Sequence, residues 1–270
     1  MNVSISNLAW DIKDDEHIVN LLIENNINSI DLAPAKYFPN PLKTKETEII
    51  KLRDFWNSRG INIIGLQALL FGSSGLNIFG SEVVRDSMLT YLKSICRIGS
   101  LLGAKHLVFG SPKNRDTKEL NDMEVSNISI SFFRELGRIA AGYGVEICIE
   151  PNPEVYGSNF ITNSKEAATL VEQINHPNIK MQLDTGSILI NNENLESILV
   201  NFSHLIGHIH LSEPFLIPYG QDKEICLNHS LLIKKYLKNH SVTIEMLNSK
   251  CNSSKDISNS IKLANLQFKH

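Results

Sequence analysis

The segment GHIHLSEP contains two histidines, His208 and His210, separated by a single isoleucine. Side chains alternate between the two faces of a β-strand, so both imidazoles are predicted to point to the same side. Three acidic residues stand in similar settings, at or near the end of an apolar run and just before a turn. They are Glu150 in EICIEPNP, Asp184 in MQLDTGS and Glu245 in VTIEML.

These residue types are suited to metal binding. Three carboxylates on one face would raise one another's pKa, and burying them unpaired is costly, whereas a divalent cation removes that penalty. Three carboxylate oxygens and one imidazole nitrogen suit Mn²⁺, Mg²⁺ or Co²⁺, and Zn²⁺ is a further option. Taken singly, each acidic residue is more simply interpreted as a helix cap or a lysine partner. Four such residues at the same height favour one metal site, formed by Glu150, Asp184, His210 and Glu245.

His208 lies one alternation deeper in its strand than His210. At that depth we expect it in the interior, where a hydrogen bond from its ring orients a neighbouring ligand. It also counts among the substrate-site candidates.

The chain repeats a short β-branched run, a turn and an amphipathic helical stretch, with strand starts 20 to 45 residues apart. This spacing is typical of βα units, and eight of them predict a closed (β/α)₈ TIM barrel of the α/β class, with residues 1–270 forming a single domain. The predicted strands are 3–7, 29–33, 61–69, 106–111, 146–151, 181–186, 207–213 and 242–246. The longest breaks, 33–45, 71–80 and 111–124, follow strands and therefore lie on the C-terminal face, where such barrels build their active sites.

Composition restricts the class of partner. Of the 270 residues, 42% are apolar and 20% charged, and the net charge of −3 argues against nucleic acid or a membrane surface as partner. The four cysteines form no CxxC pair, and the N-terminus lacks the pattern of a secretory signal, so a reduced, cytoplasmic protein is expected. A small-molecule ligand is the expected partner, and a homodimer or a homotetramer is compatible with the sequence.

The order Glu150, Asp184, His210, Glu245 on strands five to eight resembles the xylose-isomerase-like barrel superfamily, and most closely its sugar epimerase and isomerase branch. This resemblance implies that Glu150 and Glu245 bind the metal and also act as the acid/base pair, while Asp184 and His210 complete the metal site. The implied activity is isomerisation or epimerisation of a small sugar or sugar-like hydroxyketone through an enediolate.

Two other activities of the same superfamily stay open. One is dehydration of a cyclic polyol ketone or a dehydroshikimate-like acid. The more remote one is a nuclease of the endonuclease IV type, which usually needs a histidine-rich trinuclear zinc site and a basic DNA-binding face.

The sequence departs from the ketose 3-epimerase pattern at two positions. Ser187 stands where a histidine is common, and Leu216 where an arginine is common. Both changes remove substrate contacts, so a modified or anionic substrate is expected. Lys113 and Arg115 are then the candidate cations, and Gln67 and Asn152 are candidates for binding sugar hydroxyls. Together with Ser187 and His208, these residues make up the predicted substrate site.

Overall fold

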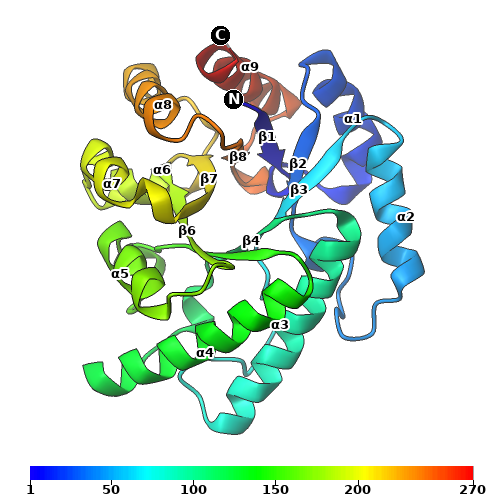
Figure 1. The fold of residues 1–270 in the computed structure, drawn as a ribbon. Coiled ribbons are helices and arrows are strands. Elements are labelled where there is room, and N and C mark those ends of the chain that lie inside the picture. The colour runs from blue at the N-terminus through cyan, green and yellow to red at the C-terminus, as the bar shows by residue number, and fades with distance from the viewer. Residues whose placement is uncertain (270) are drawn as a thin grey trace.

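In the computed structural model, which describes residues 1–269, eight parallel strands form a closed barrel in chain order (Figure 1). The strands are β1 (Val3–Ser6), β2 (Ser29–Leu32), β3 (Asn62–Leu66), β4 (His106–Phe109), β5 (Glu146–Ile149), β6 (Ile179–Asp184), β7 (Ile206–Ser212) and β8 (Val242–Glu245). The barrel closes through pairing of β1 with β8, in the register Val3 to Val242. The predicted (β/α)₈ barrel is confirmed, and each of the eight predicted strands overlaps an observed one.

The helices surround the barrel, as Figure 1 shows. Within the described residues they are α1 (Asp15–Glu24), α2 (Glu46–Asn57), α3 (Glu82–Leu102), α4 (Asp122–Gly142), α5 (Ser164–Ile174), α6 (Thr185–Ile190), α7 (Leu195–Phe202), α8 (Lys223–Tyr236) and α9 (Ser254–Phe268). None of these helices is both long enough and apolar enough to cross a membrane.

The break predicted at 111–124 is shorter in the structure, because α4 begins at Asp122. The Asn121 side chain accepts hydrogen bonds from the backbone N–H groups of Met123 and Glu124, and the Glu124 carboxylate accepts one from the Asn121 N–H. This reciprocal capping starts the helix before its apolar periodicity becomes visible in the sequence.

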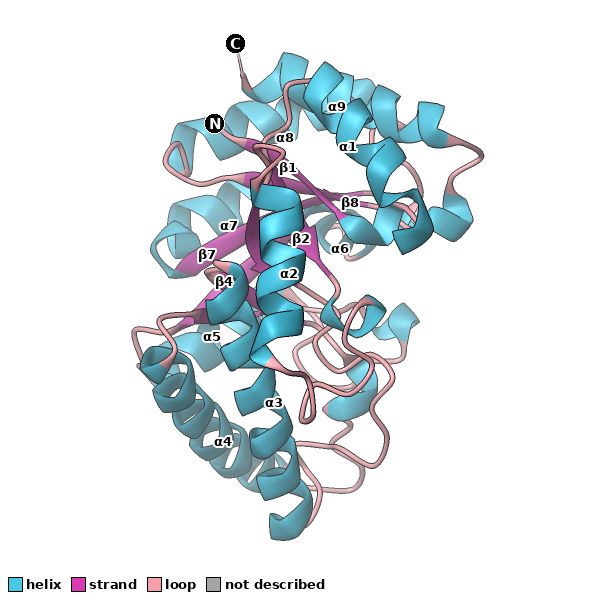
Figure 2. Cartoon of the chain, turned by 90° about the vertical axis from the view of Figure 1, so that its right-hand side faces the viewer, coloured by secondary structure: helices cyan, strands magenta, loops and turns pink. Residues whose placement is uncertain are grey.

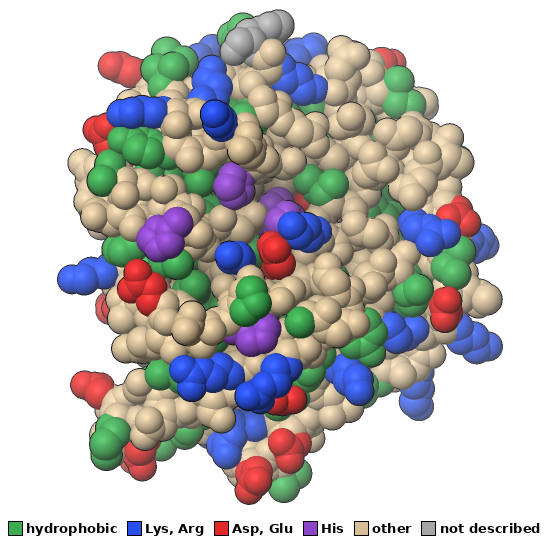
Figure 3. All heavy atoms as spheres, viewed as in Figure 1, with side chains coloured by type: hydrophobic (Ala, Val, Ile, Leu, Met, Phe, Trp, Pro, Cys, Tyr) green, Lys and Arg blue, Asp and Glu red, His purple; other side chains and the backbone are tan. Residues whose placement is uncertain are grey.

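The two ends of the barrel differ. In Figure 2 the long connecting loops gather on the side opposite the start of β1. Figures 1 and 3 look onto the other end, and Figure 3 shows charged and histidine side chains near the centre of this face. There Glu146 pairs with Lys105 and His106 at the start of β4 and β5. In barrels of this kind the active site is built at the loop-rich C-terminal end.

Candidate functional site

Four side chains from consecutive strands converge at the C-terminal end of the barrel. Asp184 and Glu245 end β6 and β8, Glu150 directly follows β5, and His210 lies within β7. One ligand atom from each residue lies within 4.8 Å of those of the other three. His210 Nδ1 is 3.2 Å from Glu245 Oε2 and 3.4 Å from Glu150 Oε1. The structure thus brings together the four residues that were predicted as metal ligands.

Two amides hold the glutamates in place. Gln67, which follows β3, donates from Nε2 to Glu245 Oε1 at 2.7 Å. Asn152 donates from Nδ2 to Glu150 Oε2 at 3.2 Å. Each glutamate therefore keeps one oxygen on an amide and turns the other toward His210.

Asp184 is held from two sides. Its Oδ1 accepts the Ser187 backbone N–H at 2.7 Å, because Asp184 is the N-cap of α6. Its Oδ2 accepts the Ser212 hydroxyl at 2.7 Å. The start of one helix and the neighbouring strand β7 together fix the direction of this carboxylate.

Glycine at position 110, just after β4, leaves the space that the Glu150 carboxylate occupies. A β-carbon at Gly110 would overlap Glu150 Oε2. The position of the glutamate therefore depends on the absence of a side chain on the adjacent strand.

The electrostatics of the site reflect its crowding. Burial raises the pKa of Asp184, and the nearby Glu150 carboxylate raises it further. Burial alone would lower the pKa of His210, but the carboxylates of Glu245, Asp31 and Glu150 outweigh that effect and raise the pKa well above its usual value. Three carboxylates lie close together around His210, and this arrangement favours binding of a cation.

The donor set fits a divalent cation. Glu150 Oε1 is buried and has no hydrogen-bond partner, although it faces the other ligand atoms. An orphaned carboxylate oxygen beside two further carboxylates and an imidazole is an arrangement that a metal ion satisfies. Three oxygen donors and one nitrogen donor favour a hard or borderline ion.

A cavity of about 950 Å³ opens above this cluster. Glu150, Asp184 and Glu245 lie in its wall, as do four of the predicted substrate-site residues: Gln67, Lys113, Asn152 and Ser187. Most of the remaining lining is apolar and comes from β4 and from the loops after β3, β4, β5, β7 and β8. The volume is at the upper end of the range usual for small-molecule sites.

Arg115 does not lie where the sequence analysis placed it. Its side chain is fully buried and outside the cavity lining. The guanidinium donates to the Glu150 carbonyl oxygen at 2.8 Å and to Asn152 Oδ1. The guanidinium therefore forms hydrogen bonds within the protein instead of facing an anionic substrate. It also supports Asn152, the amide that holds Glu150.

His208 is likewise outside the cavity lining. It is 2% exposed, and its Nε2 lies 2.6 Å from Asp31 Oδ2 on β2. Its position agrees with the expected interior role and gives it no direct path to a ligand in the cavity. The sequence analysis did not predict a role for Asp31. The only signal for it was an acidic residue within the apolar run SIDLA.

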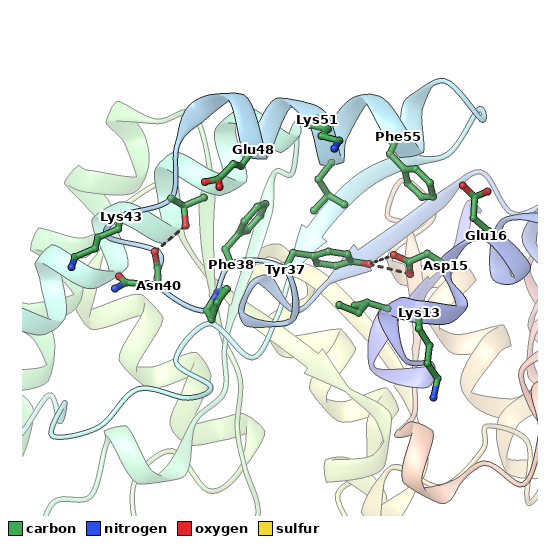
Figure 4. Close-up of a pocket in the computed structure, with 14 residues that line it drawn as sticks. Lys13, Asp15, Glu16, Tyr37, Phe38, Asn40, Lys43, Glu48, Lys51 and Phe55 are labelled. Atoms are coloured by element: carbon green, nitrogen blue, oxygen red, sulfur yellow. Dashed lines mark hydrogen bonds between the residues drawn. The ribbon is translucent and has the colours of Figure 1, made fainter.

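A second cavity, of about 620 Å³, lies outside the barrel, between the start of α1 and α2 (Figure 4). Asp15 lines this cavity, and its carboxylate accepts hydrogen bonds from the Trp10 indole and the Tyr37 hydroxyl. These contacts tie the loop after β2 to α1, so the Asp15 carboxylate has a structural explanation.

Comparison with known proteins agrees with this architecture. A family model described as "Xylose isomerase-like TIM barrel" matches residues 19–229. Among curated proteins, a D-psicose 3-epimerase of Ruminiclostridium cellulolyticum is 27% identical over 85 residues. That alignment spans 32% of this chain and 29% of the relative's length.

Solved structures share the fold over the whole chain at low sequence identity. D-psicose 3-epimerase with D-tagatose, from Clostridium cellulolyticum, superposes with a TM-score of 0.80 at 17% identity and covers 99% of this chain and 98% of its own. A 3-keto-D-glucoside 4-epimerase from E. coli gives 0.78 at 14% identity, with both chains fully covered. The IOLI protein with a bound zinc atom gives 0.75 at 19%, covering 100% of this chain and 98% of its own.

Proposed function

Because the chain belongs to the xylose isomerase-like TIM barrel family, we propose that it is a divalent-metal-dependent isomerase or epimerase of a small sugar or sugar-like hydroxyketone. The observation that carries this proposal is the pairing of Glu150 and Glu245 across His210, each with one oxygen held by an amide. Two fixed carboxylates beside a cation site are what proton transfer at carbon requires.

Glu150, Asp184, His210 and Glu245 would hold the ion. When bound, a divalent cation polarises a carbonyl and lowers the pKa of the adjacent C–H. Mn²⁺, Mg²⁺ and Co²⁺ suit the donor set, and the zinc atom in the IOLI structure keeps Zn²⁺ among the candidates.

The two glutamates divide the proton transfer between them. One carboxylate removes the proton from the carbon beside the carbonyl, and the electron pair moves into the enediolate. The other, as the acid, returns a proton to the opposite face of that carbon or to its neighbour. The first outcome is epimerisation and the second isomerisation. Gln67 and Asn152 keep both carboxylates aimed inward throughout.

We further propose that the substrate carries an appendage beyond a plain ketose. Ser187 and Leu216 line the cavity where the look-alike epimerases commonly have a histidine and an arginine. The exposed Lys113 also lines the cavity, so an anionic or otherwise polar appendage would meet a cation there. Arg115 is no longer part of this proposal, because its guanidinium is buried.

Turnover in D₂O tests the proposed reaction. The metal-loaded protein is screened with ketoses, their phosphates and cyclic polyol ketones, and deuterium is expected on the carbon next to the carbonyl. Glu150→Gln and Glu245→Gln should each lose about 10²-fold or more in rate, because the base is removed while the shape is kept. Glu154→Gln, on an exposed position of the same loop as Glu150, serves as control. Product without solvent deuterium would contradict the proposal.

A further inference from the structure

Phe215, in the loop after β7, has a strained backbone and an exposed side chain, so it contributes little to the stability of the fold. Its backbone adopts φ 59°, and that of Leu216 adopts φ 54°, a region that favours glycine. Phe215 is 54% exposed, so its large apolar side chain gains little from burial. A glycine at position 215 would relieve the strain at that residue, so the presence of a large aromatic side chain needs another explanation.

The surrounding loops hold this strained residue in place. The Phe215 N–H donates to the Tyr156 hydroxyl at 2.8 Å, and the two rings meet edge to face with centroids 5.7 Å apart. Leu216 donates its N–H to the Glu213 carbonyl and accepts the N–H of Leu247 at 2.9 Å. The loops after β5, β7 and β8 thus position one exposed aromatic ring.

That ring faces the substrate cavity. Phe215, Tyr156 and Leu216 all line it, and Phe71, 72% exposed, lines it from the loop after β3. The metal cluster lies at the strand ends, whereas these aromatic and aliphatic side chains come from the connecting loops, where the cations Lys113 and Lys250 also line the cavity. A ketose held at the cluster would leave this apolar wall free for a further group of the substrate.

We propose that Phe215, positioned by Tyr156, forms an outer subsite that packs against a second ring of the substrate, so that the natural substrate is a glycoside of a keto sugar. This inference rests on the proposed function and narrows its substrate class. Aromatic side chains supply a large flat apolar surface at low entropic cost, which suits the apolar face of a sugar ring.

The test compares ketoses with and without a second ring. D-Fructose is measured against the ketose disaccharides lactulose, turanose and isomaltulose, by calorimetry on the metal-loaded protein, so that binding is scored without turnover. At least one disaccharide should bind more tightly than fructose. Phe215→Gly should weaken that disaccharide about threefold to tenfold, the scale of an aromatic contact, and leave fructose unchanged. Val155→Ala, an exposed position next to Tyr156 but outside the cavity, is the control.

Thermal unfolding separates this role from a structural one. Phe215→Gly should melt close to the wild-type temperature, because relief of the strain at φ 59° offsets the lost ring contact with Tyr156 and the added freedom of the unfolded chain. A wild-type protein that binds no disaccharide better than fructose overturns the proposal, as does a Phe215→Gly variant that weakens both sugars equally. Disaccharide preference without deuterium incorporation would instead refute the proposed reaction and leave the subsite standing.

A second, independent observation concerns Asp31. Its carboxylate is fully buried beneath the metal cluster, with Oδ2 at 2.6 Å from His208 Nε2 and 3.7 Å from His210 Nε2. On the adjacent strand, a β-carbon at Gly65 would come within 2.7 Å of this carboxylate. The pairing of β2 with β3 also shifts register between Ile30 and Asp31. The fold makes room for this acid.

We infer that Asp31 is a positioning residue for His210. A carboxylate behind Nε2 favours the tautomer that carries its hydrogen on Nε2, which leaves the Nδ1 lone pair on the side of Glu150 and Glu245, where it would be free to bind a cation. His208 Nε2 lies 2.6 Å from the same Oδ2 and so helps to fix the position of the carboxylate.

Metal affinity and the His210 tautomer test this role. Asp31→Asn should bind Zn²⁺ or Mn²⁺ about 10- to 100-fold more weakly, and Gly65→Ala, which crowds the carboxylate, should weaken binding less. Asp15→Asn removes a partly buried carboxylate far from the barrel axis and should bind the metal normally. In the zinc-loaded wild type, ¹⁵N NMR should show His210 with hydrogen on Nε2. Hydrogen on Nδ1, or wild-type affinity in both Asp31→Asn and Gly65→Ala, would overturn the inference.

Discussion

Replacing Arg115 by methionine should destabilise the protein far more than it affects the recognition of an anion. Methionine keeps most of the stem volume, so the change mainly removes the guanidinium. The Glu150 carbonyl oxygen and Asn152 Oδ1 then lose their donor in a buried setting. Burial lowers the pKa of Arg115 to about 10, which shows that the cation is held at a solvation cost.

The expected size of the effect follows from these contacts. Hydrogen bonds from a charged group contribute about 1.5–3 kcal/mol each. Two are lost, and removal of a buried cation returns part of its desolvation cost, so we expect the free energy of unfolding to fall by about 3–5 kcal/mol. The rate should fall as well, because Asn152 loses the contact that directs it toward Glu150.

Chemical denaturation of the metal-free protein measures the free energy of unfolding, with Lys113→Met as the matched control. Lys113 is exposed, so its replacement should change the free energy of unfolding by less than about 0.5 kcal/mol. The reasoning fails if Arg115→Met unfolds like the wild type and raises only the KM of anionic substrates. That result would return Arg115 to the substrate contact that the sequence analysis predicted.

Four further outcomes are expected. His210→Ala, which removes the nitrogen donor, should take up no divalent ion in elemental analysis after dialysis, and retained metal would mean that the ligand set is wrong. Gly110→Ala should displace the Glu150 carboxylate and cost about 10²-fold in kcat, as small misplacements do, whereas Gly142→Ala, with open space around it, should retain full activity. Lys113→Ala should raise KM for a ketose phosphate more than for the unphosphorylated sugar, and equal effects would exclude it as an anion contact. A chelator should lower Tm if the folded protein binds the ion, and an unchanged Tm would count against a bound metal.

The barrel and the convergence of the four cluster residues could be predicted from the sequence because both depend on short periods. Strand alternation and the position just before a turn place Glu150, Asp184 and Glu245 at one height in the barrel. This placement does not depend on how the outer helices pack. Each strand was predicted to end one to three residues too late, because no residue type in the sequence marks the last hydrogen bond of the ladder.

Residues whose roles depend on long-range contacts could not be predicted. Nothing near Arg115 in the chain shows that its guanidinium turns inward to the carbonyl of Glu150. Asp31 meets His208 only because β2 and β7 face each other across the barrel interior. The left-handed backbone at Phe215 is equally hidden, because the usual signal for it is a glycine or an asparagine.

The placement of all four cluster residues on β5 to β8 also has a consequence for biosynthesis. Glu150 and Glu245 are separated by roughly a hundred residues, which a ribosome adds in about 5–20 seconds. During that interval the nascent chain presents an incomplete set of donors, and the barrel cannot close until β8 pairs with β1. The cluster is therefore completed only once β8 is available, and its completion coincides with the joining of the two ends of the sheet.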